Sequence, residues 1–122
     1  MFDIPKKTIL IDENIPFLDT ILRQSFEIIK FNARELTAQK LIDSNCFALF
    51  VRSTTKVNQD LLEDTAVQFV ATATSGSEHI DKEYLLQNNI FFAVKLYFPA
   101  IVLQVHSQIA LLGLKRYVFN FV

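Results

Sequence analysis

Glycine is scarce in this chain, since only Gly76 and Gly113 occur among its 122 residues. The glycine-rich turn that binds the phosphates of a dinucleotide needs several glycines within a few positions. Two isolated glycines cannot form that turn, so these residues contain no nicotinamide-binding site of that kind. Hydride transfer needs such a site. We therefore expect no cofactor-binding residue and no cofactor in this chain.

The chain also has few cysteines and a small net charge. The single cysteine, Cys46, cannot form an internal disulfide, and its place beside an apolar run favours a packed side chain. The net charge is −1, with acidic and basic residues interspersed, which argues against a nucleic-acid partner because such proteins need a basic face. The start around Pro5 lacks the pattern of a signal peptide. Together these features predict a cytoplasmic protein.

The rest of the chain alternates strand and helix patterns. Short apolar runs predict strands, whereas capping residues and helical spacing predict helices. We expect strands at residues 8–11, 27–31, 47–51, 68–71 and 90–94. We expect helices after Pro16, over 37–42, after Asn58 and after Asp81, the first with Ile15, Leu18, Ile21 and Leu22 on one face. This order predicts an α/β fold with a parallel sheet and right-handed crossovers.

Polar segments follow the third and fourth predicted strands. Residues 52–56 read Arg-Ser-Thr-Thr-Lys, and residues 71–76 read Ala-Thr-Ala-Thr-Ser-Gly. In an open α/β sheet, ligands bind just beyond the carboxyl ends of the strands. Hydroxyl groups, backbone N–H groups, the cations Arg52 and Lys56 and a conformationally permissive Gly76 suit a small anion there. The sequence therefore predicts a site for a phosphate or carboxylate.

Three segments carry a resemblance to a known family. They are residues 9–16 (ILIDENIP), 51–58 (VRSTTKVN) and 69–81 (FVATATSGSEHID). In order and spacing they resemble the N-terminal substrate domain of the erythronate-4-phosphate dehydrogenases, which belong to the NAD-dependent D-2-hydroxyacid dehydrogenases and serve pyridoxal 5′-phosphate (vitamin B6) synthesis. The resemblance covers roughly residues 8–92. It implies a flavodoxin-like five-stranded sheet, with 4-phosphoerythronate as the small-molecule partner.

The resemblance also implies two substrate-binding residues. The family's serine in its Val-Arg-Ser motif falls on Ser53, and its threonine in the Thr-Ala-Thr motif falls on Thr74. Each hydroxyl can donate a hydrogen bond to an anionic oxygen. From residue types alone, both could equally cap strand-to-helix turns. Arg52 either adds charge to the site or pairs with Asp12 or Glu13.

Other polar residues receive no catalytic or metal-binding role. The family's catalytic arginine, glutamate and histidine fall beyond these residues. We expect His79 to have a structural role at a helix start, and we assign no function to His106. Asp12 and Glu13 are of the residue types that bind a divalent cation, but the resemblance implies that they are structural at a strand end.

The last part of the sequence departs from the family. Residues 96–114 carry no formal charge, and Val102, Val105, Ile109 and Leu112 share one helical face. An amphipathic helix is favoured over a membrane span by four polar residues in the middle, which are Gln104, His106, Ser107 and Gln108. Residues 110–114 again resemble the family's linking helix. We expect a substrate domain over residues 1–94 and an apolar helical tail over 95–122, through which the chain self-associates.

Together these observations predict a truncated substrate-binding domain, related to an oxidoreductase and inactive alone. Whether the chain is itself an enzyme stays open. The alternative is a receiver-like interaction module, with Asp12 and Glu13 after the first strand, Thr72 or Thr74 after the fourth and Lys95 after the fifth. A receiver needs a phosphoacceptor aspartate after the third strand, where this chain has Arg52 and Ser53. Only a module that is not phosphorylated would fit.

Overall fold

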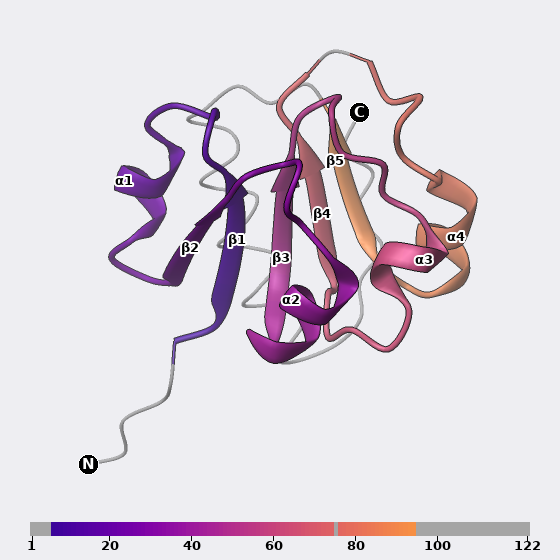
Figure 1. Ribbon diagram of the computed structural model, residues 1–122, viewed down its shortest axis with the longest axis horizontal. Coiled ribbons are helices and arrows are strands. Elements are labelled where there is room, and N and C mark those ends of the chain that lie inside the picture. Colours follow the sequence, from indigo (N-terminus) through magenta and orange to yellow (C-terminus); the bar gives the residue numbers. More distant parts are fainter. Residues whose placement is uncertain (1–5, 75, 95–122) are drawn as a thin grey trace.

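The computed structural model describes residues 6–74 and 76–94, which form five strands alternating with four helices (Figure 1). The strands are β1 (Thr8–Asp12), β2 (Glu27–Phe31), β3 (Cys46–Val51), β4 (Phe69–Thr72) and β5 (Phe91–Val94). The helices are α1 (Leu18–Leu22), α2 (Ala38–Asp43), α3 (Gln59–Leu62) and α4 (Lys82–Gln87).

The strands form one parallel sheet in the order β2-β1-β3-β4-β5. This is the flavodoxin-like order, so the prediction of a five-stranded parallel sheet with flanking helices is confirmed. The predicted apolar helix in the tail lies outside the described residues, and so does His106.

Burial along the strands follows their place in the sheet. All six residues of β3 are buried, because this strand lies in the middle and has both faces covered. The strand β2 lies at an edge, and only Phe31 of its five residues is buried. The expectation that residues 27–31 form a strand near an edge is therefore confirmed.

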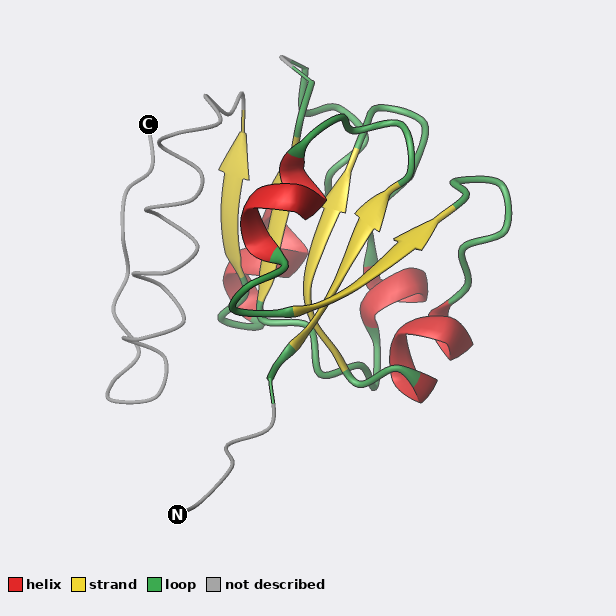
Figure 2. Ribbon diagram, turned by 90° about the vertical axis from the view of Figure 1, so that its left-hand side faces the viewer, coloured by secondary structure: helices red, strands yellow, loops and turns green. Residues whose placement is uncertain are grey.

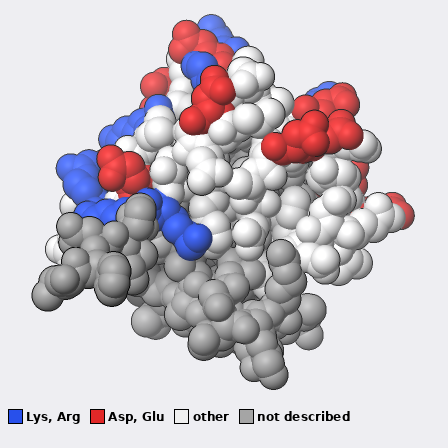
Figure 3. Space-filling model, turned by 90° about the horizontal axis from the view of Figure 1, so that it is seen from below, with Lys and Arg blue, Asp and Glu red and all other residues white. Residues whose placement is uncertain are grey.

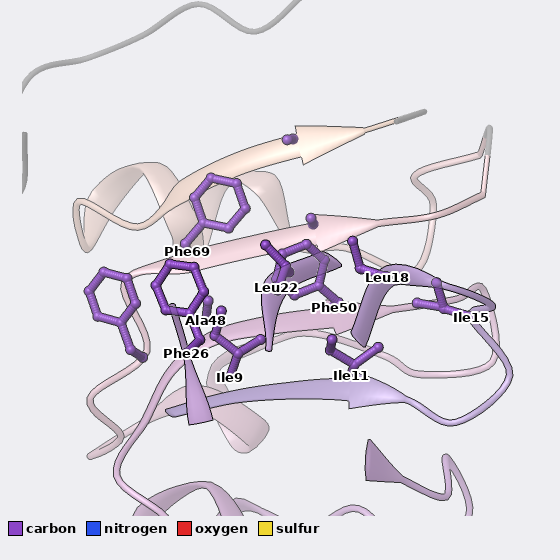
Figure 4. Close-up of a cluster of buried hydrophobic side chains, with 12 residues drawn as sticks. Ile9, Ile11, Ile15, Leu18, Leu22, Phe26, Ala48, Phe50 and Phe69 are labelled. Atoms are coloured by element: carbon purple, nitrogen blue, oxygen red, sulfur yellow. The ribbon is translucent and has the colours of Figure 1, made fainter. Parts of the chain in front are cut away.

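Two hydrophobic clusters fill the two sides of the sheet. On one side, Leu18 and Leu22 of α1 pack with Ile9, Ile11 and Phe50 of the central strands (Figure 4). On the other side, Leu41 of α2, Leu62 of α3 and Leu85 of α4 pack with Leu10, Leu49 and Val70. Figure 2 shows the twisted sheet between these helices. Helices on both sides are what right-handed crossovers between parallel strands require.

Three of the helices begin at side-chain caps. Thr37 accepts a hydrogen bond from the N–H of Lys40, Asn58 from Leu61, and Asp81 from Tyr84. These caps satisfy backbone donors that have no partner in the first helical turn. The caps expected at Asn58 and Asp81 are both present.

The first helix differs from its prediction. Phe17 precedes α1 in the left-handed conformation, with φ of 66°, and gives no side-chain cap. Pro16 therefore lies before the helix rather than in its first turn. Ile21, which we expected on the buried face, is 39% exposed. The other three residues of the predicted stripe, Ile15, Leu18 and Leu22, are buried, although Ile15 lies before the helix.

Charges of both signs are distributed over the surface. Seen from the end of the sheet at which the strands begin, acidic and basic side chains lie on either side of an uncharged area of the described surface (Figure 3). The described part of this face carries charges of both signs rather than the continuous basic surface that binds nucleic acid. Within residues 6–74 and 76–94, no helix has the length and apolar character needed to cross a bilayer.

Candidate functional site

The carboxyl ends of β1 and β3 lie side by side at the point where the strand order reverses. The chain leaves β1 toward β2 on one side, and it leaves β3 toward β4 on the other. In open parallel sheets the crevice for a ligand forms at such a point. The candidate site therefore combines the loop that follows β1 with the loops that follow β3 and β4.

An ion pair joins the first two of these strand ends. Asp12 is completely buried at the end of β1, and its Oδ1 lies 3.3 Å from Nε of Arg52. The same Oδ1 accepts a hydrogen bond of 2.9 Å from the N–H of Asn14. The sequence left Asp12 and Glu13 as possible partners of Arg52. In the structure Arg52 pairs with Asp12. The second oxygen, Oδ2, has no hydrogen-bond partner among the residues that the structure describes.

Backbone hydrogen bonds hold the loops after β3 and β4 together. Val57 donates to the carbonyl of His79 at 2.8 Å and accepts from the N–H of Asp81 at 2.8 Å. The N–H of Ala73 donates to the carbonyl of Val51 at 2.9 Å. The loops thus continue the pairing of their strands, and they run together above the sheet (Figure 1). The fold therefore brings the segments of Ser53 and Thr74 to one edge.

Ser53 lies in a turn closed by a hydrogen bond of 3.2 Å from the N–H of Thr55 to the carbonyl of Arg52. Its side chain is exposed and forms no hydrogen bond with the described residues. Ser53 therefore does not cap a turn, which was the alternative to ligand binding. Its hydroxyl is available to a ligand beside the charge of Arg52.

Thr74 is half-buried and takes part in a chain of hydrogen bonds. Its Oγ1 lies 2.9 Å from Oγ1 of Thr72, and 3.5 Å from the carbonyl oxygen of Gly76. The hydroxyl of Thr72, which is completely buried, lies 2.9 Å from Nε2 of His79. The side chain of Thr74 is thus connected to a histidine through a buried hydroxyl.

Burial of His79 favours the neutral form of its imidazole ring. Its pKa is lowered because burial disfavours the imidazolium, an effect that the nearby charge of Glu78 partly opposes. The sequence predicted a structural role for His79, but it did not indicate the contact with Thr72. The two residues are seven positions apart across a loop, so no local spacing rule connects them.

Gly76 does not use the left-handed conformation that favours glycine, since its φ is not positive. A Cβ at this position would lie 2.7 Å from Oε2 of Glu78, at the flexible end of that side chain. Lys56, the other predicted cation, is exposed and forms no ion pair with the described residues.

Neither a metal nor a dinucleotide fits the described residues. No three residues among the histidines, cysteines, aspartates and glutamates of residues 6–74 and 76–94 gather closely enough to hold a metal ion. The turn from β1 to α1 contains no glycine, and Phe17 occupies its left-handed position. A dinucleotide needs small residues there so that its phosphates can approach the backbone. The residues present do not fit the NAD of the family.

The parallel sheet and the polar loops at its carboxyl edge define an α/β domain of the flavodoxin-like class. Residues 8–94 match the family model of the D-isomer specific 2-hydroxyacid dehydrogenase, catalytic domain. The chain therefore belongs to the D-isomer specific 2-hydroxyacid dehydrogenase family.

Three enzymes of one kind are similar to this chain in sequence. The chain is 44% identical over 85 residues to the erythronate-4-phosphate dehydrogenase of Teredinibacter turnerae and 46% identical over 85 residues to that of Marinobacter nauticus. Each match covers 70% of this chain and 22% of the relative. The enzyme of Yersinia pestis is 40% identical over a segment of the same length. The chain thus matches about a fifth of the length of these enzymes.

Solved structures share the fold. A putative D-isomer specific 2-hydroxyacid dehydrogenase from Polaromonas superposes with a TM-score of 0.57 at 20% identity, covering 73% of this chain and 30% of that one. The pyruvate reductase of Chlamydomonas reinhardtii gives a TM-score of 0.57 at 8% identity, covering 94% of this chain and 40% of that one. At these identities the likeness concerns the fold alone.

Proposed function

We propose that the chain is a substrate-binding domain for a small phosphorylated hydroxyacid, with 4-phosphoerythronate as the ligand. The observation that carries this proposal is the exposed hydroxyl of Ser53, which has no partner among the described residues and follows Arg52 at the strand-order reversal. Thr74 lies in the adjoining loop. The names of the relatives in Teredinibacter turnerae and Marinobacter nauticus support the choice of ligand.

The chemistry of the loops suits an anion. A phosphate or carboxylate oxygen accepts hydrogen bonds only, and the hydroxyls of Ser53 and Thr74 can both donate. Arg52 contributes a positive charge, part of which Asp12 already balances. Lys56 is exposed and without an ion partner in the described part of the chain. This is a modest set of contacts, so we propose weak binding by the domain alone.

We further propose that these 122 residues do not oxidise the ligand by themselves. The residues after β1 do not fit a dinucleotide, and the positions that match the family provide no catalytic arginine, glutamate or histidine. In the oxidoreductases that the chain resembles, NAD binding would come from a separate domain. The purified chain should therefore show no NAD-dependent turnover of 4-phosphoerythronate.

We also propose that the substrate domain ends at residue 94 and that an apolar tail follows it. The apolar tail, residues 95–122, would mediate self-association through its hydrophobic face. Size-exclusion chromatography of the full chain, compared with a version ending at Ala93, tests this division. A monomeric full chain that binds no hydrophobic dye would contradict it.

The binding proposal is tested with matched variants. Equilibrium dialysis of the chain against 4-phosphoerythronate should give an affinity that falls about tenfold in Ser53→Ala and in Thr74→Val, since each removes one hydrogen bond to a charged group. Thr20→Ala, on the exposed side of α1, should bind like the wild type. Equal affinities in all four proteins would contradict the proposed site.

A further inference from the structure

The hydrogen bonds around Thr72 have a direction, and it can be worked out from the groups at their ends. The chain of contacts runs from Nε2 of His79 through Oγ1 of Thr72 and Oγ1 of Thr74 to the carbonyl oxygen of Gly76. A hydroxyl both donates and accepts, whereas a carbonyl oxygen only accepts. The carbonyl of Gly76 therefore fixes one end of the chain.

The donor of each hydrogen bond can be assigned in turn, starting from the carbonyl of Gly76. Thr74 donates to Gly76, so its oxygen accepts from the hydroxyl of Thr72. Thr72 has only one hydroxyl hydrogen, and it therefore cannot also donate to His79. Nε2 of His79 must then carry a hydrogen and donate to Thr72. In this arrangement Thr72 also accepts the N–H of Thr74 at 3.5 Å, so all its hydrogen-bonding capacity is used.

The opposite direction satisfies fewer groups. If Thr72 donated to His79, Thr74 would have to donate to Thr72. The oxygen of Thr74 would then face the carbonyl oxygen of Gly76, 3.5 Å away, with no hydrogen between them. Thr72 makes three hydrogen bonds in either direction. The two directions therefore differ only in the contact between Thr74 and Gly76, which the first direction satisfies and the second leaves without a hydrogen.

We propose that His79 is a positioning residue that acts through Thr72 to present the hydroxyl hydrogen of Thr74 to a bound anion. The contact between Thr74 and Gly76 is at the long limit of a hydrogen bond. An anionic oxygen is a stronger acceptor and displaces that contact without reversing the other two. This inference rests on the proposed role of Thr74 in ligand binding.

The lowered pKa of His79 agrees with a neutral ring that donates a hydrogen bond to Thr72. Its pKa is lowered by burial, so near neutral pH the ring carries one hydrogen, on either Nδ1 or Nε2. The direction of the hydrogen bonds assigns that hydrogen to Nε2. The tautomer is therefore an observable consequence that requires no ligand.

The first test measures that tautomer in the free chain. Two-bond proton–nitrogen correlation spectra of the wild-type protein, recorded above the titration range of His79, distinguish a protonated from an unprotonated ring nitrogen. We expect a protonated Nε2 and an unprotonated Nδ1. A hydrogen on Nδ1 would overturn the role of His79, whether or not the chain binds a ligand.

The second test removes the intermediate hydroxyl. Thr72→Val keeps the shape of the buried side chain, and Thr72→Ser keeps the hydroxyl. NMR titration with 4-phosphoerythronate should show binding roughly threefold to tenfold weaker in Thr72→Val, with affinity restored in Thr72→Ser. Thr65→Val is a control at a half-buried threonine whose hydroxyl donates to Leu62 in another loop.

The outcomes separate this inference from the proposed function. Unchanged affinity in Thr72→Val would overturn the role of His79 and leave the binding site intact. No binding by the wild-type chain, together with a protonated Nε2, would overturn the proposed function and uphold the direction of the hydrogen bonds. If Thr72→Val does not fold, the wild-type tautomer and the affinity of Thr72→Ser still decide the question.

Discussion

Arg52 and Asp12 connect the ends of the two central strands, with Nε of the arginine 3.3 Å from Oδ1 of the aspartate. Asp12 is fully buried, whereas the side chain of Arg52 is 31% exposed. The pair therefore costs more in desolvation at its acidic end than at its basic end. A cation that balances a buried carboxylate is held at the mouth of the candidate site.

The first prediction concerns this pair. Arg52→Met should lower the free energy of unfolding by about 2 kcal/mol, because it leaves a buried carboxylate without its countercharge. Adding Asp12→Asn to that variant should recover part of the loss. Urea unfolding of the two single variants and the double variant measures the coupling. Glu13→Gln, at the neighbouring exposed carboxylate, serves as control, and purely additive effects would show that the two side chains do not interact.

Thr55 leads to a second prediction. Its side chain is 6% exposed, and its Oγ1 has no hydrogen-bond partner within residues 6–74 and 76–94. Thr55→Val should therefore be neutral or should stabilise the chain by up to about 1 kcal/mol, since it removes an unsatisfied buried hydroxyl. Thermal unfolding beside the exposed-site variant Thr54→Val measures the difference. A loss of stability specific to Thr55→Val would mean that the hydroxyl has a partner in solution.

Asp19 gives a prediction about pH. Burial alone would raise the pKa of Asp19, but the hydrogen bond and charge of Lys30 and the charge of Arg23 outweigh it, so the pKa lies below 3.8. Folding therefore favours the ionised form, and the stabilisation is complete well above pH 3.8 and lost as the pH falls through the folded-state pKa.

The variant Asp19→Asn tests whether the ionised carboxylate of Asp19 stabilises the folded chain. The variant should unfold at a lower urea concentration than the wild type near neutral pH, and the difference should be smaller at an acid pH below 3.8. Asp60→Asn, at an exposed position in the first turn of α3, provides a carboxylate control. If the Asp19→Asn difference were the same at both pH values, ionisation of Asp19 would not contribute to stability.

Cys46 yields a prediction about reactivity. Burial raises the pKa of its thiol to about 12, although backbone contacts with Leu10 and Ala48 oppose the shift. Almost no thiolate exists near neutral pH, and the side chain is completely buried. A thiol reagent should therefore label Cys46 only at the rate at which the domain unfolds. Rapid labelling of the folded chain would show that β3 opens locally.

Much of the fold could be predicted from local patterns. The limits of β2 at residues 27 and 31 follow from a short apolar run between polar residues, and the starts of α3 and α4 follow from the caps Asn58 and Asp81. The start of α1 could not be predicted in this way. Its position depends on the left-handed conformation of Phe17, which apolar spacing does not encode.

The candidate site was only partly predictable. Ser53 and Thr74 were chosen by their motifs, and the sequence allowed Arg52 two carboxylate partners without deciding between them. The structure adds the ion pair with Asp12 and the hydrogen bonds that connect His79 to Thr74 through Thr72. These contacts depend on how separate loops meet after folding, so residue spacing alone could not show them.

A map of amide chemical shifts during titration with 4-phosphoerythronate tests whether the loops after β3 and β4 form one substrate site. We expect the amides of residues 52–56 and 72–77 to shift together and to saturate at one ligand concentration, since their loops are joined through Val57. Shifts confined to Asp12 and Glu13, or no saturable shift in either loop, would contradict a substrate site at this edge of the sheet.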